Sequence, residues 1–354
     1  MSGALVDLVA KGAQDVYLTG KPEVSFFRQK YSRHTNFAMK PVELLPVGSV
    51  SSNSEVSIKI PNKGDILSGV WLDHGDNSWE NKLGSKLTKP TVFELYIGGQ
   101  LIDRQDSTFT NIIWPSHLID SGAKGMFNGQ LSDLSRITPL HFSFCDNYGL
   151  PLVALQYHEV EIKVKFSSTD PTPIKFYAEY IVLDTSEREW FANNDHTLLI
   201  EQVQKIPPST GGTDPVWDLS LLNHPVKSLH FSNVVNSSNY TIGDNAMLYL
   251  NGTQVFNSPM GRNFFTLVQP YYHSEHYSSQ FREQVAIRDA PIHMYSFAMK
   301  ASKHVPTGSC NFSRLDNAEF KATGASDSTI VNMYAVNWNI LRIKKGMAGL
   351  AFSN

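Results

Sequence analysis

The sequence predicts an all-β protein built from two similar β-sandwiches in tandem. The clearest observation is the run His158–Phe166, where apolar and charged residues alternate, as in a strand with one buried and one solvated face. Similar short runs, separated by glycine, proline, asparagine and aspartate, recur along the chain, and long helical patterns are few. The third observation is an internal repeat, described below. A length of 354 residues accommodates two domains of ~100–200 residues each.

Composition excludes several classes of protein. Aromatic residues make up 11% of the chain and charged residues 18%, which is the opposite of a disordered chain. The 30 basic and 33 acidic residues give a net charge of −3, so we expect no specific nucleic-acid partner. The N-terminus lacks the basic start of a secretory signal, and no apolar run approaches the ~20 residues of a membrane span.

The N-terminal residues predict a brief helix. The apolar residues between Ala4 and Val9 share one helical face, Ser2 can cap its start and Gly12 can end it. Such a short helix is marginal without a packing partner. After Pro22 the helical period gives way to strand-like alternation, so we expect residues 1–24 to form an N-terminal arm.

Twelve segments have the pattern of strands. The last exceeds the usual strand length, so we expect a bend within it. In chain order the segments are Glu55–Ile60, Ile66–Leu72, Val92–Ile97, Leu150–Gln156, His158–Phe166, Ile174–Leu183, Leu198–Gln204, Val226–Phe231, Ala246–Leu250, Phe264–Val268, His293–Met299 and Ile330–Ile343.

Three segments recur in the same order at offsets of 153, 157 and 160 positions. They are Phe93–Ile102 with Ala246–Val255, Tyr177–Leu183 with Tyr334–Leu341, and Gly64–Val70 with His224–His230. The repeat indicates one β-unit of ~150–160 residues, which eight strands and their loops would fill. The polar stretch 184–197 is the expected boundary, giving a first domain at 25–190 and a second at 191–354.

Five segments carry a resemblance to a known family. They are Leu8–Phe37, Leu150–Val160, Tyr180–Arg188, Tyr295–Asn317 and Asn339–Ala351. In this order they resemble the major capsid proteins of nucleocytoplasmic large DNA viruses, especially those of algal viruses. The resemblance implies two eight-stranded jelly rolls side by side, after a short N-terminal helical segment. It also implies a homotrimer whose six jelly rolls form a pseudo-hexagonal capsomer of an icosahedral shell over an internal membrane.

The family resemblance also implies a role. The chain would be a structural protein of the virion, without catalysis or cofactor, assembled in the host cytoplasm. Its partners would be its own copies, minor capsid proteins and the inner viral membrane. Family members often carry long outer loops, so this shorter chain should have a plainer outer surface. Two alternatives remain open: a jelly-roll carbohydrate-binding protein, and a minor capsid or spike protein of the same fold.

The charge distribution suggests where the membrane would lie. Residues 1–40 and residues 334–354 each carry a net charge of +3, which leaves −9 for the rest of the chain. We therefore expect both termini on the inner face of the shell, near anionic lipid or minor proteins.

No catalytic or metal site is expected. His273 and His276 have a spacing at which two imidazoles could share a metal on a helix, but no helix is predicted there and zinc needs a third ligand. We interpret them as part of a solvated loop. Asp184 and Glu187 could form a carboxylate pair for glycoside hydrolysis. We interpret them instead as acids at a strand end beside Arg188.

The remaining candidates concern modification and packing. Four Asn-x-Ser/Thr sequons occur; Asn311 is expected to be structural, which leaves Asn236, Asn239 and Asn251 as candidate glycosylation sites. Cys145 and Cys310 are expected to be unpaired, one in each sandwich. The aromatic and basic run 26–31 could stack on nucleic acid. We expect it instead to be a strand and entry loop packed under the first sandwich.

Overall fold

The computed structural model describes residues 12–73, 90–119, 137–146, 148–167, 174–208, 214–232, 245–275, 292–324 and 332–353. Residues 1–36 and 37–354 form two separate units. In the first unit, helix α2 (Ala13–Thr19) starts at Gly12, whose N–H donates to Asp15 Oδ2 at 2.9 Å. A short helix near the N-terminus is thus present. The helix predicted at Ala4–Val9, between Ser2 and Gly12, lies outside the described residues.

The run 26–31 does not form the expected packed strand. No strand includes these residues. A strand starts only at Phe37.

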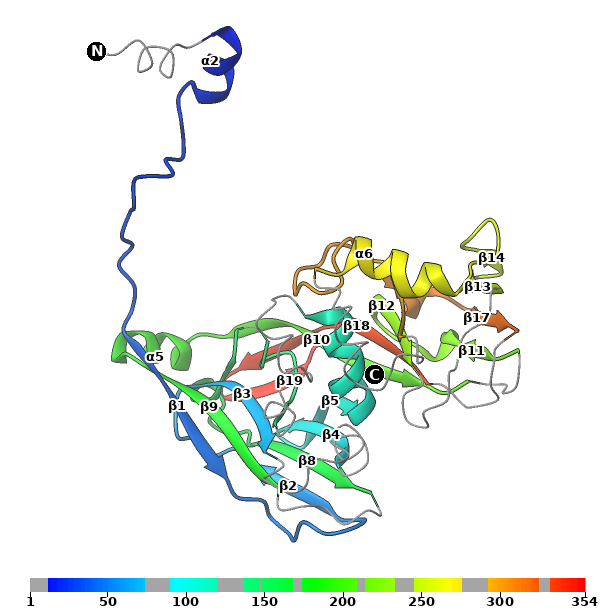
Figure 1. Cartoon of the computed structure of the whole chain (residues 1–354). Coiled ribbons are helices and arrows are strands. Elements are labelled where there is room, and N and C mark those ends of the chain that lie inside the picture. The colour runs from blue at the N-terminus through cyan, green and yellow to red at the C-terminus, as the bar shows by residue number, and fades with distance from the viewer. Residues whose placement is uncertain are drawn as a thin grey trace. The chain divides into compact units, whose positions relative to one another are not determined.

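The first sandwich pairs two antiparallel sheets (Figure 1). One has the order β1-β9-β3-β6, with β7 beside β3, and the other the order β2-β8-β4-β5. The strands are β1 (Phe37–Leu44), β2 (Glu55–Lys59), β3 (Ile66–Asp73), β4 (Pro90–Ile97), β5 (Gln100–Asp106), β6 (Ile137–Pro139), β7 (Leu150–Pro151), β8 (Val160–Phe166) and β9 (Lys175–Leu183).

The second sandwich repeats this order strand for strand. Its sheets are β10-β18-β12-β15, with β16 beside β12 and β19 beside β18, and β11-β17-β13-β14. The strands are β10 (His196–Ile206), β11 (Val216–Asp218), β12 (Pro225–Ser232), β13 (Asn245–Leu250), β14 (Thr253–Gln254), β15 (Ile292–Ser296), β16 (Cys310–Asn311), β17 (Ala318–Thr323), β18 (Met333–Lys344) and β19 (Met347–Leu350). The predicted all-β fold of two jelly rolls is confirmed.

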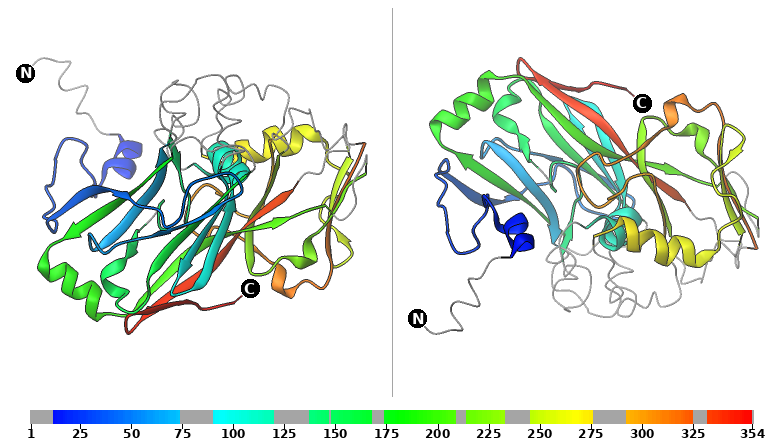
Figure 2. Two further views of the ribbon diagram at one scale, coloured as in Figure 1. Left: turned by 90° about the horizontal axis from the view of Figure 1, so that it is seen from below. Right: turned by 90° about the horizontal axis from the view of Figure 1, so that it is seen from above.

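Short helices connect the strands. Helix α5 links the two sandwiches, and a wide π-type helix, η2, lies between them as the teal helix of Figure 2. The helices are η2 (Phe109–Leu118), η5 (Leu152–Ala154), α5 (Thr185–Asn193), η6 (Leu219–Leu221), η7 (Phe264–Val268), α6 (Gln269–His273) and η8 (Phe312–Arg314).

Alternation along the strands builds one core inside each sandwich. Strand β8 buries Val160, Ile162, Val164 and Phe166 and leaves the intervening charged residues partly exposed, as predicted. The core of the first sandwich also takes in four residues from the second: Ile200, Leu341, Ile343 and Ala348. Strands β10, β18 and β19 therefore close one end of the first sandwich, and the two jelly rolls share apolar surface.

The internal repeat extends to the register of the strands. Trp71 of β3 pairs with Tyr177 of β9, and His230 of β12 pairs with Tyr334 of β18. Both pairings contain a bulge at the same place, between Leu67 and Gly69 and between Val226 and Ser228. With Trp71 equivalent to His230 the offset is 159 positions, so the expected match of Gly64–Val70 was wrong by one residue. A one-residue slip matters because it moves every side chain to the other face.

Two of the predicted strands were wrong. Phe264–Val268 is helical rather than a strand. It forms η7 and continues directly into α6, which has Pro270 in its first turn. The polar stretch after Leu183, where the domain boundary was expected, forms helix α5, with Asp184 as its N-cap. Leu150–Gln156 is a strand for only two residues before η5 begins. The last strand runs unbroken from Met333 to Lys344.

The junction between the jelly rolls and the candidate assembly surfaces

Helix η2 belongs to the first jelly roll and is buried along its whole length. It begins after β5, where the Phe109 N–H donates to Asp106 Oδ1 at 2.9 Å. The Phe109 ring lies 6.0 Å from the Tyr334 ring, and Ile113 packs in the same apolar cluster as Val336. The helix therefore covers the outer face of strand β18 in the second jelly roll.

Two buried histidines meet across this junction. His117 Nδ1 of η2 lies 3.3 Å from His230 Nδ1 of β12, and His230 Nε2 lies 2.8 Å from Ser228 Oγ. Burial, and then the nearby charges of His117 and Lys227, hold the pKa of His230 well below its usual value. His230 is therefore the neutral member of this contact.

Aspartates of β5 hold strand β10 of the second jelly roll. Asp103 Oδ1 accepts from the Val203 N–H at 2.9 Å, and its Oδ2 accepts from Gln105 Nε2 at 2.8 Å. Burial raises the pKa of Asp103 to about 6. Asp106 Oδ2 accepts from Lys205 Nζ and from the Tyr334 hydroxyl, each at 2.7 Å.

A buried lysine completes the polar part of the junction. The Lys227 side chain is only 2% exposed, and its Nζ lies 2.5 Å from Glu201 Oε1 and 5.1 Å from the Trp338 ring centre. His304 Nδ1 lies 3.2 Å from the same oxygen. Burial alone would raise the pKa of Glu201, but Lys227 and His304 outweigh it and the pKa is lowered. With its partners in place, this charge is compensated inside the protein.

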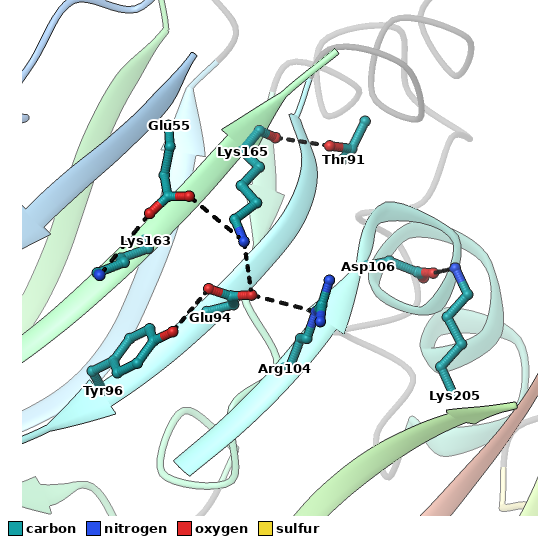
Figure 3. A network of polar contacts seen from close by, with 9 residues as sticks. All are labelled: Glu55, Thr91, Glu94, Tyr96, Arg104, Asp106, Lys163, Lys165 and Lys205. Atoms are coloured by element: carbon teal, nitrogen blue, oxygen red, sulfur yellow. Dashed lines mark hydrogen bonds and ion pairs between the residues drawn. The ribbon is translucent and has the colours of Figure 1, made fainter. Parts of the chain in front are cut away.

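The outer face of sheet β2-β8-β4-β5 is charged (Figure 3). Glu94 lies 3.2 Å from Lys165 Nζ and 3.4 Å from Arg104 Nε, and it accepts from the Tyr96 hydroxyl at 3.1 Å. Lys165 also lies 3.5 Å from Glu55. Glu94 itself is buried beneath its partners, whereas Arg104, Lys165 and Glu55 are exposed to water to a third or more of their side-chain surface.

The outer face of the other sheet of the first jelly roll is aromatic. Trp71 and Tyr177 stack with ring centres 5.7 Å apart. Trp71 borders an open cavity of about 320 Å³, whose lining also includes Trp114, Ile137, Pro139 and Glu179. On the second jelly roll, η7 and α6 expose Leu267, Val268, Tyr271 and Tyr272. Exposed apolar surfaces of this kind mark contact sites.

The sequence candidates do not gather into a catalytic site. Asp184 caps α5 by accepting from the Thr185 N–H, and Arg188 forms its bidentate pair with Asp65, at 2.8 and 3.0 Å, rather than with Asp184 or Glu187. His273 ends helix α6 and contacts the Met299 carbonyl, whereas His276 lies outside the described residues. Over the described ranges, no three His, Cys, Asp or Glu side chains cluster as metal ligands.

The candidate glycosylation sites and the cysteines are placed as follows. Asn236 and Asn239 lie outside the described residues. Asn251 is exposed in the β13–β14 turn, where its Oδ1 accepts from the N–H groups of Asp316 and Asn317. Asn311 caps η8 through the Ser313 N–H, a structural role.

Both cysteines are thiols, Cys145 at the edge of the first core and Cys310 at the edge of the second, as predicted.

Comparison with known proteins decides the family. Residues 25–185 match the family model for the major capsid protein N-terminus, and residues 187–349 match that for the large eukaryotic DNA virus major capsid protein. The chain belongs to this family of structural capsid proteins. The capsid protein is 36% identical to the major capsid protein of Pyramimonas orientalis virus and 30% identical to that of Paramecium bursaria Chlorella virus 1, each comparison covering 100% of both chains.

Structural comparison agrees with the sequences. The quasi-atomic model of the PBCV-1 virus capsid matches with a TM-score of 0.76 and 27% identity, over 93% of this chain and 100% of that one. The two sequence alignments span 410 and 450 positions, more than the 354 residues of this capsid protein, so both relatives carry insertions. Within the described part of the chain, no helix is long and apolar enough to cross a bilayer.

Proposed function

We propose that this capsid protein assembles as a homotrimer, a pseudo-hexagonal capsomer that tiles an icosahedral virus shell. The supporting observation is that both halves of the chain have the same strand order and register. Three copies therefore supply six similar sandwiches, which approximate sixfold packing around a threefold axis. Obligate interfaces of this kind commonly bury ~2,000 Å² or more.

Sedimentation of the purified chain at micromolar concentration tests the trimer. A mass of three chains is the expected result, and electron microscopy of the particles should show blocks of near-hexagonal outline. A monomer at every accessible concentration, with no shell formed under any condition, contradicts the proposal.

We also propose that the basic termini face the inner side of the shell, near the inner viral membrane or minor capsid proteins, in particles assembled in the host cytoplasm. A basic residue near an anionic surface contributes about 1 kcal/mol. In the C-terminal stretch, Lys344 lies 3.2 Å from Asp195, which leaves Arg342 and Lys345 to supply this attraction. Limited proteolysis of intact particles should spare the first 25 residues. Their removal from a closed shell would exclude an inner position.

The expected division into an arm at 1–24, a first jelly roll at 25–190 and a second at 191–354 stays a proposal. Glycosylation at Asn236, Asn239 and Asn251 is likewise proposed, and exposure of the β13–β14 turn supports it at Asn251. Mass spectrometry of peptides from virions checks it, because an unmodified mass at all three positions excludes it.

A further inference from the structure

We propose that, in the trimer, the helical segment 264–273 (η7 and α6) of one copy packs on the outer face of sheet β1-β9-β3-β6 in the first jelly roll of the next copy. The inference rests on the proposed trimer and names the two surfaces that close it. It follows from the contact that the two jelly rolls already make within one chain.

The contact within the chain is the template. Helix η2 of the first jelly roll lies on the outer face of the second, with His117 against His230 and Phe109 against Tyr334. His230 and Tyr334 are register partners on neighbouring strands, so the helix covers one defined spot on the sheet.

The second jelly roll has its own copy of this helix. Segment 264–273 follows hairpin β13–β14 as η2 follows hairpin β4–β5. At an offset of 155 positions, Phe109 matches Phe264 and Pro115 matches Pro270. Both segments are of the π type in whole or in part, so they are equivalent in sequence, in place and in helical form.

The two helices differ in what covers them. Ile113 and His117, which contact the neighbouring jelly roll, are at most 1% exposed. Their equivalents Val268 and Tyr272 are 41% and 63% exposed. The same face of the helix that is covered in the first jelly roll is thus open in the second.

The receiving spot is open as well. By strand register, Trp71 and Tyr177 are the equivalents of His230 and Tyr334. Among the described residues, Trp71 borders the open cavity of about 320 Å³, and the one helix residue in the lining of that cavity is Trp114 of η2 from the same chain. Glu179 lines the same cavity and can accept a hydrogen bond from a tyrosine hydroxyl.

A second copy of this chain is the occupant that fits. Over the described ranges, each chain has one satisfied junction, one exposed helix on its second jelly roll and one open receiving face on its first. The free helix of one copy and the free face of the next make a head-to-tail contact, and such contacts close into a ring when the rotation allows. A closed ring in which first and second jelly rolls alternate, six in all, contains three chains.

A photo-cross-linking amino acid at position 272 tests the contact. We expect cross-linked chain dimers whose peptides join residue 272 to the segments 66–73, 137–146 or 174–183 of the other copy. Cross-links between copies that map only to other segments would refute this contact while leaving the trimer intact. A protein that stays monomeric refutes the trimer itself, so the two failures are distinguishable.

A pair of substitutions gives an independent measure. The double variant Val268→Ser, Tyr272→Ser should raise the trimer dissociation constant at least tenfold, because an apolar face that is buried only on assembly is lost. The matched control is Leu221→Ser, at an apolar residue of the same jelly roll that is 67% exposed. Circular dichroism should show the native fold for both variants. Equal dissociation of variant and control would overturn the proposal.

Discussion

Among single residues, His230 makes the most direct prediction about pH. Its pKa is lowered in the folded protein, so below the unfolded value of about 6.5 the unfolded chain binds a proton that the folded chain excludes. Stability should therefore fall with decreasing pH, by up to about 1.4 kcal/mol per pH unit for one proton. The variant His230→Gln should lose this part of the pH dependence between pH 6.5 and 5.5 in denaturant melts.

The difference between wild type and His230→Gln reports on the histidine alone, because both proteins contain Asp103, which acts in the opposite direction. Its pKa is raised to about 6, so its contribution to stability is lost as pH rises from 3.8 to 6 in both proteins. The control His34→Gln, in the separate N-terminal unit, should leave the slope unchanged. An identical slope for wild type and His230→Gln would show that the pair does not titrate as argued.

Arg188 carries a second prediction at this scale. Its guanidinium binds both carboxylate oxygens of the buried Asp65, which also accepts from the Leu183 N–H at 2.8 Å. Replacement by alanine leaves Asp65 with the Leu183 N–H as its donor and should lower the melting temperature of the chain. Arg188→Lys, a point charge that cannot bind both oxygens, should recover only part of the loss in thermal melts. Full recovery would show that charge alone matters.

Sequence could not have identified these residues. Arg188 was expected to accompany Asp184 and Glu187, its neighbours in the chain, yet it pairs with a residue 123 positions away. Lys227 and His230 lie in a repeated segment that carries no chemical signature, and His117 lies in none; the role of all three comes from the contact of the two sandwiches. Short-range signals such as sequons and caps are local, whereas buried polar pairs are defined by the tertiary fold.

Among the elements, η2 is the one on which the junction depends. Ile113 is fully buried in the apolar cluster between the jelly rolls. Ile113→Ala should lower the free energy of unfolding by about 2–5 kcal/mol, through lost burial and the cavity it leaves. Leu221→Ala, at an exposed apolar position, should cost far less in the same denaturant titration. Equal effects would mean that the junction contributes little to stability.

Strands were easier to predict than helices. Strand β8 alternates because one of its faces meets the core and the other meets water. The sequence of η2 has no such signal, since every residue is buried and Pro115 lies inside it. The same holds for Phe264–Val268, where an apolar run fits a strand as well as a buried helix. The sequence match between Phe264–Val268 and η2 would have predicted a helix only if η2 had already been known to be helical.

At the scale of the whole molecule, the two jelly rolls should unfold together. The first core includes Ile200, Leu341 and Ile343 from the second jelly roll. A fragment of residues 25–190 lacks these side chains and should bind hydrophobic dyes and show no cooperative melt, whereas the full chain should show one transition. Two separate transitions in calorimetry would mean that the shared core does not couple the halves.

The tandem architecture could be predicted because the two halves of the chain have similar sequences at equivalent positions. Matches such as Tyr177 with Tyr334 occupy equivalent strand positions, and the family resemblance spans nearly the whole chain. The residues of the junction were not predictable, because the two halves diverged where one became covered and the other stayed open.

The covalent link through helix α5 has a kinetic consequence. The junction within the chain joins two parts of one molecule, so its formation is a first-order event at an effective local concentration that does not depend on how much protein has been made. The equivalent junction between copies forms in a reaction of higher order, so its rate depends on the concentration of folded chains. A newly made chain can therefore complete its own fold while dilute, and capsomers accumulate steeply only once synthesis has raised the concentration of folded chains. The duplicated unit thereby separates the time of folding from the time of shell construction.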